Sequence, residues 1–223
     1  MNYLFVVAHP DDEVLGAGAT IHKLIQEGNK VAVATLVSRA GARANISATL
    51  QDDQARAFEI MGVHKSYKGD FPNIKMNTVS HLELVQFIEK CIEDWRAESV
   101  FTHYPSDLNN DHVMTSYACQ AASRLFQRKE GVPRLKKFIY MEVPSSTEWS
   151  FDSSANRFSP NMFVEVGKDG VDVKFRALAA YKGVMRPYPH PRSKEGIEGL
   201  AAYRGIQAGC SYAEAFESVF YRT

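Results

Sequence analysis

The sequence predicts an α/β protein in which helices cover both faces of a mostly parallel sheet, and three observations favour this class. Residues 3–8 form an apolar run, rich in Val and Phe, that is typical of a buried strand in a parallel sheet. Further short apolar segments alternate with longer segments of helical periodicity. The 223 residues, 45% of them hydrophobic, suffice for one substantial core. We therefore expect a three-layer sandwich in a single domain, 1–223, with a core of about 1–143 and a C-terminal elaboration, 144–223.

Within this core, five predicted strands alternate with four predicted helices. Gly28 and Gly62 follow the first two helices, at positions where helices commonly end. Because strand and helix repeat in units of this size, right-handed crossovers favour a doubly wound parallel sheet with the strand order 3-2-1-4-5. The expected strands span 3–8, 30–37, 66–69, 99–103 and 137–143, and the expected helices span 13–27, 49–61, 78–96 and 111 to about 129.

The last of these helices is predicted to bury one apolar stripe. Val113, Tyr117, Ala121 and Leu125 recur at helical spacing, so we expect them to lie on one face. In this arrangement His112 belongs to the first turn of the helix, close to the tip of the strand over 99–103.

After residue 143 the pattern becomes richer in loops. Residues 144–160 are rich in Ser and Asn, and three prolines between residues 187 and 191 exclude helix and indicate an extended loop. We expect this part of the chain to form part of the substrate mouth. Its other expected elements are an edge strand at 162–166, helices at about 171–181 and 194–205, and a tail over 209–216.

Composition narrows the classes of partner and the compartment. The 26 basic and 26 acidic residues give zero formal net charge, so no overall field favours nucleic acid or an acidic membrane surface. No apolar stretch is long enough to span a membrane, and no segment resembles a signal peptide. Cys91, Cys119 and Cys210 are widely spaced, which argues against a thiolate metal site and indicates a reducing compartment. We therefore expect a cytoplasmic protein.

Two clusters of polar residues follow predicted strands that are neighbours in this sheet. His9-Pro10-Asp11-Asp12-Glu13 comes directly after the first strand, and Asp111-His112 follows the fourth. In open α/β sheets, ligands bind at the carboxyl ends of the strands, in the crevice where adjacent connections diverge to opposite faces. Both clusters are therefore expected to line one crevice, although a hundred residues separate them.

His9, Asp12 and His112 make up a set of two histidines and one carboxylate. Such ligands suit Zn²⁺, with Fe²⁺ also compatible, and three protein ligands leave a position for a water molecule that ionises near pH 7. Asp11 is expected to take the proton of this water and to return a proton to a leaving amine. Taken singly, the acidic residues also fit a solvated helix N-terminus. The second cluster at the same crevice favours the metal.

These motifs resemble the two signature motifs of the PIG-L/LmbE-like N-acetylglucosaminyl deacetylases. The similarity covers His9-Pro-Asp-Asp-Glu13 with Leu15-Gly-Ala-Gly18 behind it, Asp111-His112, and the segment 204–216, which is similar to the tail of bacterial members. It implies a Rossmann-like fold, a divalent metal that is usually zinc, and hydrolysis of an N-acetyl group from an amino sugar. Under this resemblance, His9, Asp12 and His112 match the metal ligands, Asp11 matches the base, and Asp111 matches the acidic residue beside the third ligand.

One position departs from the family pattern. Many members carry a second histidine three positions before the third ligand, and here this position is Asn109. An amide does not titrate, but it can donate a hydrogen bond to an oxyanion. Either Asp11 handles both proton transfers or another group substitutes, and His190 and His103 are the candidates.

Residues of the loops at the same edge are candidates for substrate binding. His190 lies between Pro189 and Pro191, with Arg192 directly after them, and a preorganised His with an Arg suits an oxyanion and an anionic substrate group. Each candidate also fits an ordinary loop or surface position. The other candidates for substrate binding are Arg39 and Arg43 after the second strand, Glu142 at the end of the fifth strand, and Trp149, whose ring could stack on a sugar.

The sequence thus favours a zinc-dependent hydrolase acting on a small N-acetyl sugar or sugar conjugate, with neither nucleic acid nor membrane as a partner. Assembly into a homo-oligomer stays open. One alternative is a Mg²⁺-dependent phosphatase with Asp11 as nucleophile, which two histidines disfavour because Mg²⁺ prefers oxygen ligands. The other alternative is a catalytically silent metal-binding or sugar-binding protein, motivated by Asn109.

Overall fold

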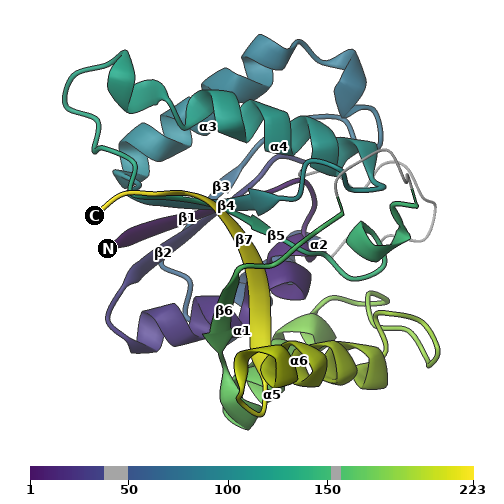
Figure 1. Cartoon of the computed structure of the whole chain (residues 1–223). Coiled ribbons are helices and arrows are strands. Elements are labelled where there is room, and N and C mark those ends of the chain that lie inside the picture. The colour runs from purple at the N-terminus through teal and green to yellow at the C-terminus, as the bar shows by residue number, and fades with distance from the viewer. Residues whose placement is uncertain (38–49, 152–156) are drawn as a thin grey trace.

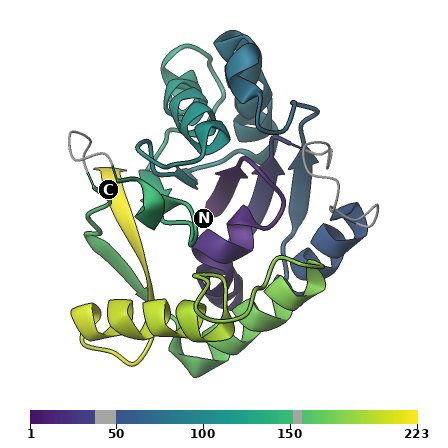
Figure 2. The same ribbon diagram turned by 90° about the vertical axis from the view of Figure 1, so that its right-hand side faces the viewer.

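The computed structural model describes residues 1–37, 50–151 and 157–223, and within these ranges seven strands form one sheet. Helices cover both faces of the sheet, as Figures 1 and 2 show from two directions. The predicted fold class is therefore confirmed. The strands are β1 (Asn2–Val7), β2 (Lys30–Thr35), β3 (Lys65–Lys68), β4 (Ser99–His103), β5 (Lys137–Met141), β6 (Met162–Glu165) and β7 (Ala213–Tyr221). The helices are α1 (Asp12–Gln26), α2 (Leu50–Met61), α3 (His81–Trp95), α4 (Asn110–Ala122), α5 (Gly167–Ala180) and α6 (Lys194–Ala208).

The strand order is β3-β2-β1-β4-β5-β7-β6, which contains the predicted order 3-2-1-4-5. The first five strands are parallel, and β7 pairs antiparallel with both β5 and β6. Because β1 and β4 are parallel neighbours, the turns that follow them meet at one edge of the sheet. Both polar clusters of the sequence lie in these turns and in the first turns of the helices that follow them, α1 and α4.

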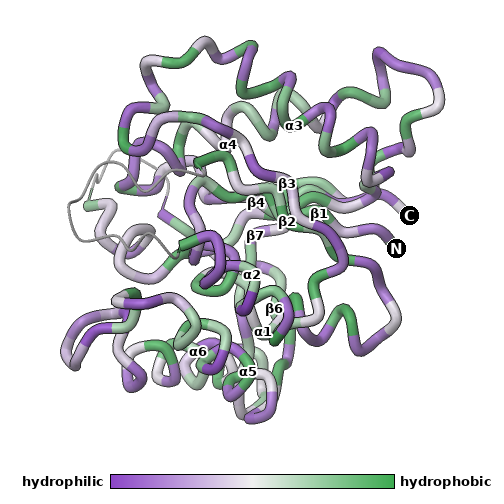
Figure 3. Tube along the Cα trace, turned by 180° about the vertical axis from the view of Figure 1, so that it is seen from behind, coloured by the Kyte–Doolittle hydropathy of each residue, from purple (hydrophilic) through white to green (hydrophobic). Residues whose placement is uncertain are grey.

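The core has two halves, one on each face of the sheet. Leu4 and Val6 of β1 pack with α3 and α4, whereas Phe5 and Val7 pack with α1, α2 and α5, as the alternation of a strand requires. The hydropathy colouring shows hydrophobic strands in the centre and many hydrophilic segments on the periphery (Figure 3). None of the helices in the described ranges has both the length and the apolar character needed to cross a membrane.

Helix α4 differs from its prediction in both length and buried face. It ends at Ala122 rather than near residue 129, and a short 3₁₀ turn, Leu125–Gln127, follows. Tyr117, expected in the buried stripe, is 51% exposed. The buried face instead carries polar residues such as His112 and Thr115, because it borders the polar edge of the sheet. Apolar periodicity therefore pointed to the wrong face.

The C-terminal tail also differs from its prediction. Residues 213–221 form the nine-residue strand β7, which lies between β5 and the predicted edge strand β6. Short 3₁₀ turns at Met76–Thr78 and Thr147–Trp149 complete the described elements.

Strand β7 and helix α5 together hold a break in α1. Ala17 has non-helical torsion angles (φ −151°, ψ 18°), which leave backbone groups of neighbouring residues without helical partners. Lys174 Nζ donates to the carbonyl oxygen of Leu15 at 2.7 Å, and the Glu214 carboxylate accepts from the Thr20 N–H at 2.7 Å. Lys174 and Glu214 are buried and lie 2.7 Å from each other. The first turn of α1, which carries Asp12, is thus anchored by the C-terminal elements.

Candidate metal centre and active site

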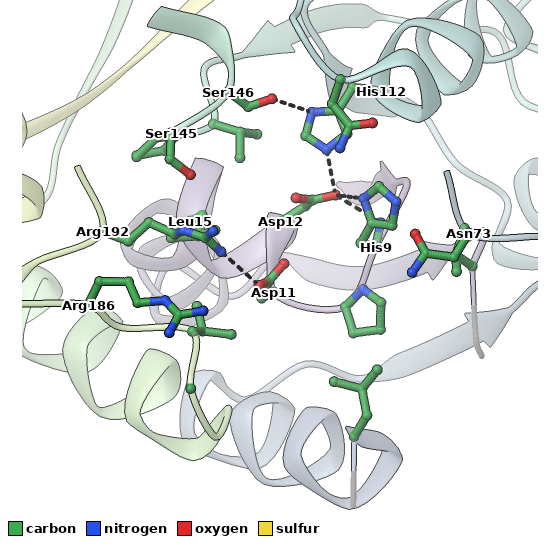
Figure 4. A pocket seen from close by; sticks show the side chains of 18 of the residues that line it. His9, Asp11, Asp12, Leu15, Asn73, His112, Ser145, Ser146, Arg186 and Arg192 are labelled. Atoms are coloured by element: carbon green, nitrogen blue, oxygen red, sulfur yellow. Dashed lines mark hydrogen bonds and ion pairs between the residues drawn. The ribbon is translucent and has the colours of Figure 1, made fainter. Parts of the chain in front are cut away.

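Three side chains at the carboxyl edge of the sheet converge as a metal site would require. His9 follows β1, Asp12 begins α1 and His112 lies in the first turn of α4. Asp12 Oδ2 lies 3.3 Å from His9 Nδ1 and 3.2 Å from His112 Nε2 (Figure 4). One ligand atom from each residue lies within 4.8 Å of the others. The spacing is therefore short enough for one cation to contact all three.

Carboxylates orient both imidazole rings from behind. His9 Nε2 lies 3.0 Å from Asp111 Oδ2, and His112 Nδ1 lies 3.2 Å from Asp107 Oδ1. Donation from these nitrogens leaves His9 Nδ1 and His112 Nε2 as the free lone pairs, which is the usual arrangement of metal-binding histidines. Burial lowers the pKa of both rings, but the carboxylates outweigh it and raise the pKa to about 9 for His9 and about 10 for His112. A cation entering the site must therefore displace protons.

Asp107, which the sequence analysis missed, is a further candidate site residue because it contacts His112. It is buried, accepts from the Thr147 hydroxyl at 2.7 Å and from the Asn109 N–H at 2.8 Å, and is also bonded by Ser146. The His112 hydrogen bond and charge lower its pKa against the effect of burial. Because metal-binding histidines commonly donate to carboxylates, an acidic residue in the turn before His112 was the signal that could have found it.

Asp11 occupies an unusual backbone position beside the ligands. Its φ of 102° lies in the left-handed region, which residues other than glycine rarely adopt. Its N–H donates to the buried Glu13 carboxylate at 3.2 Å, and the Tyr181 hydroxyl donates to the other oxygen of Glu13. Burial, together with the charge of Asp12, raises the pKa of Asp11 to about 7. A carboxyl group with this pKa can exchange a proton near neutral pH.

A cavity of about 430 Å³ opens in front of these groups. This volume lies in the range of small-molecule sites. Around the candidate ligands and Asp11, the cavity is lined by amide, hydroxyl and cationic side chains. The polar residues that line it are His9, Asp11, Asp12, Asn73, Asn109, His112, Ser145, Ser146, Lys182, Arg186 and Arg192.

The structure brings several of the predicted site residues to this cavity. Asn109 lines it and caps α4, with its Oδ1 accepting from the Asp111 N–H at 2.9 Å, so that its NH₂ group is the remaining donor. Arg192 lines it as well, and its Nη1 lies 3.7 Å from Asp11 Oδ2. Asp111 lies behind His9, where the N–H groups of Ile74 and Met76 also donate to it at 2.6 and 3.1 Å.

Other predicted substrate residues lie elsewhere. Glu142 is held by Arg204, whose Nε and Nη2 lie 2.8 and 2.6 Å from its two oxygens, and it does not line the cavity. Trp149 is 47% exposed and lies against Phe151 instead. Arg39 and Arg43 fall outside the described residues.

Neither candidate for replacing the family histidine at position 109 lines the cavity. His190 Nδ1 accepts from the Arg192 N–H at 3.0 Å, so this ring supports the loop. His103 is fully buried, accepts from the Ala8 N–H at 2.8 Å and stacks on His112 with ring centroids 3.9 Å apart. Burial and the charge of His112 lower its pKa to about 3, so it is neutral at physiological pH. Asp11 is therefore the titratable candidate that lies beside the ligands on the cavity.

Comparisons with known proteins agree with this geometry. The family model described as PIG-L, GlcNAc-PI de-N-acetylase, matches residues 4–123, which include both polar clusters. The uncharacterized deacetylase YaiS of Escherichia coli K12 is 27% identical over 188 residues, 80% of this chain and 89% of that protein.

Two solved structures share the fold along almost the whole chain. The N,N'-diacetylchitobiose deacetylase of Pyrococcus horikoshii has a TM-score of 0.78 at 19% identity, covering 98% of this chain and 83% of that one. GalB of Pseudomonas putida KT2440, a 4-carboxy-2-hydroxymuconate hydratase, has a TM-score of 0.76 at 22% identity, covering 100% of this chain and 97% of that one. Since the fold serves two reactions, the choice between them depends on the site.

Proposed function

This chain belongs to the PIG-L family, and on that premise we propose that it is a zinc-dependent hydrolase that removes the N-acetyl group from an N-acetylated amino sugar or sugar conjugate. The observation that carries the proposal is the convergence of His9, Asp12 and His112 beside Asp11 on one cavity. The family match covers all four residues. The deacetylases among the proteins of similar sequence and structure support the same reaction class.

The donor set fits a divalent cation. Two imidazole nitrogens and one carboxylate oxygen suit zinc, with Fe²⁺ as the nearest alternative, and carboxylates already orient both rings. When bound, such a cation lowers the pKa of water and polarises a carbonyl oxygen. His9, Asp12 and His112 would hold it.

The side chains around the ligands supply the proton transfers. Asp11 accepts a proton from the attacking water as the new C–O bond forms, and it returns this proton to the nitrogen as the amide C–N bond breaks. The products are acetate and the free amine. Asn109 can donate a hydrogen bond from its NH₂ group to the carbonyl oxygen as negative charge develops there.

The test is acetate release from purified protein that has been stripped with a chelator and reloaded with zinc, iron or no metal. Free N-acetylglucosamine, N,N'-diacetylchitobiose and a nucleotide-linked N-acetyl sugar make up the first panel. We expect release only with metal, and we expect Asp11→Asn to lower kcat by about 10²–10⁴-fold while keeping its metal. The exposed Asp52→Asn serves as the matched control. Full activity of Asp11→Asn, or sugar binding without turnover on any N-acetyl compound, would contradict the proposal.

A second candidate reaction is the addition of water to a carbon–carbon double bond of a carboxylate-rich acid. It is favoured by Asn109, which cannot titrate, and by the cationic residues on the cavity wall. GalB shows that this fold can serve a hydratase. Loss of ultraviolet absorbance on incubation with unsaturated di- and tricarboxylic acids, without acetate release from the sugar panel, would favour hydration over deacetylation.

A further inference from the structure

The cavity has walls of opposite charge. The candidate ligands and Asp11 occupy one side, and Lys182, Arg186 and Arg192 contribute three cations from the segment that follows α5. Figure 4 shows the Arg186 and Arg192 side chains close together, with both guanidinium groups turned toward the side of Asp11. Since the formal net charge of the chain is zero, this cationic wall is a local feature and not part of a general basic surface.

The loop that carries the two arginines is internally bonded. The Arg186 N–H donates to the carbonyl oxygen of Arg192 at 3.2 Å, which sets the two residues opposite each other. The Arg192 N–H donates to the His190 ring at 3.0 Å, and the Ser193 N–H donates to the His190 carbonyl oxygen at 2.8 Å. Ser193 then caps α6 by accepting from the Gly196 N–H at 2.9 Å. The backbone positions of the two arginines are thus set before any ligand arrives, which reduces the entropy lost on binding.

The charged groups of this wall have unused hydrogen-bonding capacity. In the described part of the chain, Arg192 Nε is buried without a hydrogen-bond partner. The contact of Arg192 with Asp11, at 3.7 Å, is beyond hydrogen-bonding distance. Over the same ranges, the exposed side chains of Arg186 and Lys182 take part in neither an ion pair nor a hydrogen bond, so their donors are open to a ligand. A buried donor without a partner, such as Arg192 Nε, is uncommon and is often satisfied by a ligand or an ion.

We propose that Arg186, Arg192 and Lys182 form an anion subsite that binds a phosphate or carboxylate group of the substrate. Guanidinium groups match both anions with paired N–H donors, and an ammonium adds a point charge. The negative charge of Asp11 can account for the presence of Arg192 in the cavity. It does not account for Arg186 and Lys182. This inference rests on the proposed function, which places the N-acetyl group of the substrate beside the candidate metal ligands. The substrate class is then an anionic N-acetyl amino sugar.

The experiment compares matched neutral and anionic ligands on Arg186→Ala, Arg186→Lys and Lys182→Ala. Free N-acetylglucosamine is the neutral compound, its 6-phosphate is the phosphate arm, and N-acetylmuramic acid is the carboxylate arm. We expect the wild type to prefer one anionic arm, and we expect Arg186→Ala to lower the ratio of anionic to neutral kcat/KM by about 10–100-fold. Arg186→Lys should give an intermediate ratio. The exposed Arg176→Ala, on α5 and away from the cavity, should leave the ratio unchanged.

Calorimetry on the metal-stripped protein separates this inference from the reaction itself. Binding of the phosphorylated or carboxylated sugar should weaken with added salt and with Arg186→Ala, and it does not require turnover. If no acetate is released but this binding is found, the subsite stands and the deacetylase proposal fails. Equal affinity for neutral and anionic sugars, with Arg186→Ala behaving like Arg176→Ala, would overturn the subsite.

Discussion

The two sides of the cavity are built in different ways. On the metal side, side chains are buried and bonded to one another, and Asp12 and His112 retain only 5% and 3% of their side-chain exposure. On the side of the proposed anion subsite, the Arg192 side chain keeps 23% exposure, and its backbone is held by hydrogen bonds within a loop. The proposed chemistry thus depends on short motifs at strand ends, whereas the proposed anion subsite depends on how distant C-terminal elements pack. Substitutions on the two sides, and in the elements that join them, are therefore expected to change different properties of the protein.

The largest effect is expected from removing a candidate ligand. His9→Ala removes one of three donors, and we expect metal affinity to fall by more than about 100-fold, since losing even an orienting partner typically costs 10–100-fold. Acetate release should fall with it. Metal content by mass spectrometry and a zinc titration measure the change, and the exposed His81→Ala is the control. Metal binding at wild-type affinity in His9→Ala would show that the cation lies elsewhere.

The second-largest effect is expected from a substitution that breaks the contact between the C-terminal elements and helix α1 of the metal side. Glu214→Ala leaves Lys174 buried without its partner and frees the backbone of α1 at the break, so we expect the free energy of unfolding to fall by about 3–5 kcal/mol. Chemical denaturation measures it. Glu198→Ala removes a partner of Lys168 whose side chain is 31% exposed, and it should have little effect. If Glu214→Ala unfolds like the wild type, the C-terminal region does not hold the first turn of α1.

The motifs at the strand ends could be predicted from the sequence, whereas the arrangement of the C-terminal elements could not. The strand order followed from alternating elements, and it placed His9 and His112 in one crevice because β1 and β4 are parallel neighbours. Local patterns could not show that β7 inserts beside β5, because strand pairing depends on the whole sheet. They also could not show that Arg186 faces the cavity, which follows from a loop closed by its own backbone.

A smaller effect is expected from a substitution of Asp107, which lies behind the candidate ligand His112. Asp107→Asn keeps the shape of the side chain but weakens the acceptor of His112 Nδ1, so we expect metal affinity to fall by about 10–100-fold with the fold intact. The zinc titration that is applied to His9→Ala measures it. Asp169→Asn on α5 is a control outside the cavity. An unchanged affinity would mean that Ser146 alone can orient the His112 ring.

The smallest effect is expected at Glu142, and it tests the division between the two sides most directly. Its carboxylate is occupied by two hydrogen bonds from Arg204, and both side chains keep about one-seventh of their exposure or less. We therefore expect Glu142→Gln to lower the free energy of unfolding by about 1 kcal/mol, between the values typical of exposed and buried pairs.

Because Glu142 lies outside the cavity, its substitution should leave kcat/KM within about twofold of the wild type, which corresponds to at most about RT ln 2 in transition-state stabilisation. Arg204→Ala should behave in the same way, and a double-mutant cycle should recover the coupling of the pair in stability but not in activity. A rise in KM of tenfold or more for Glu142→Gln at unchanged stability would place this carboxylate in contact with substrate. The wall that binds substrate would then extend across β5, beyond the loop of Arg186 and Arg192.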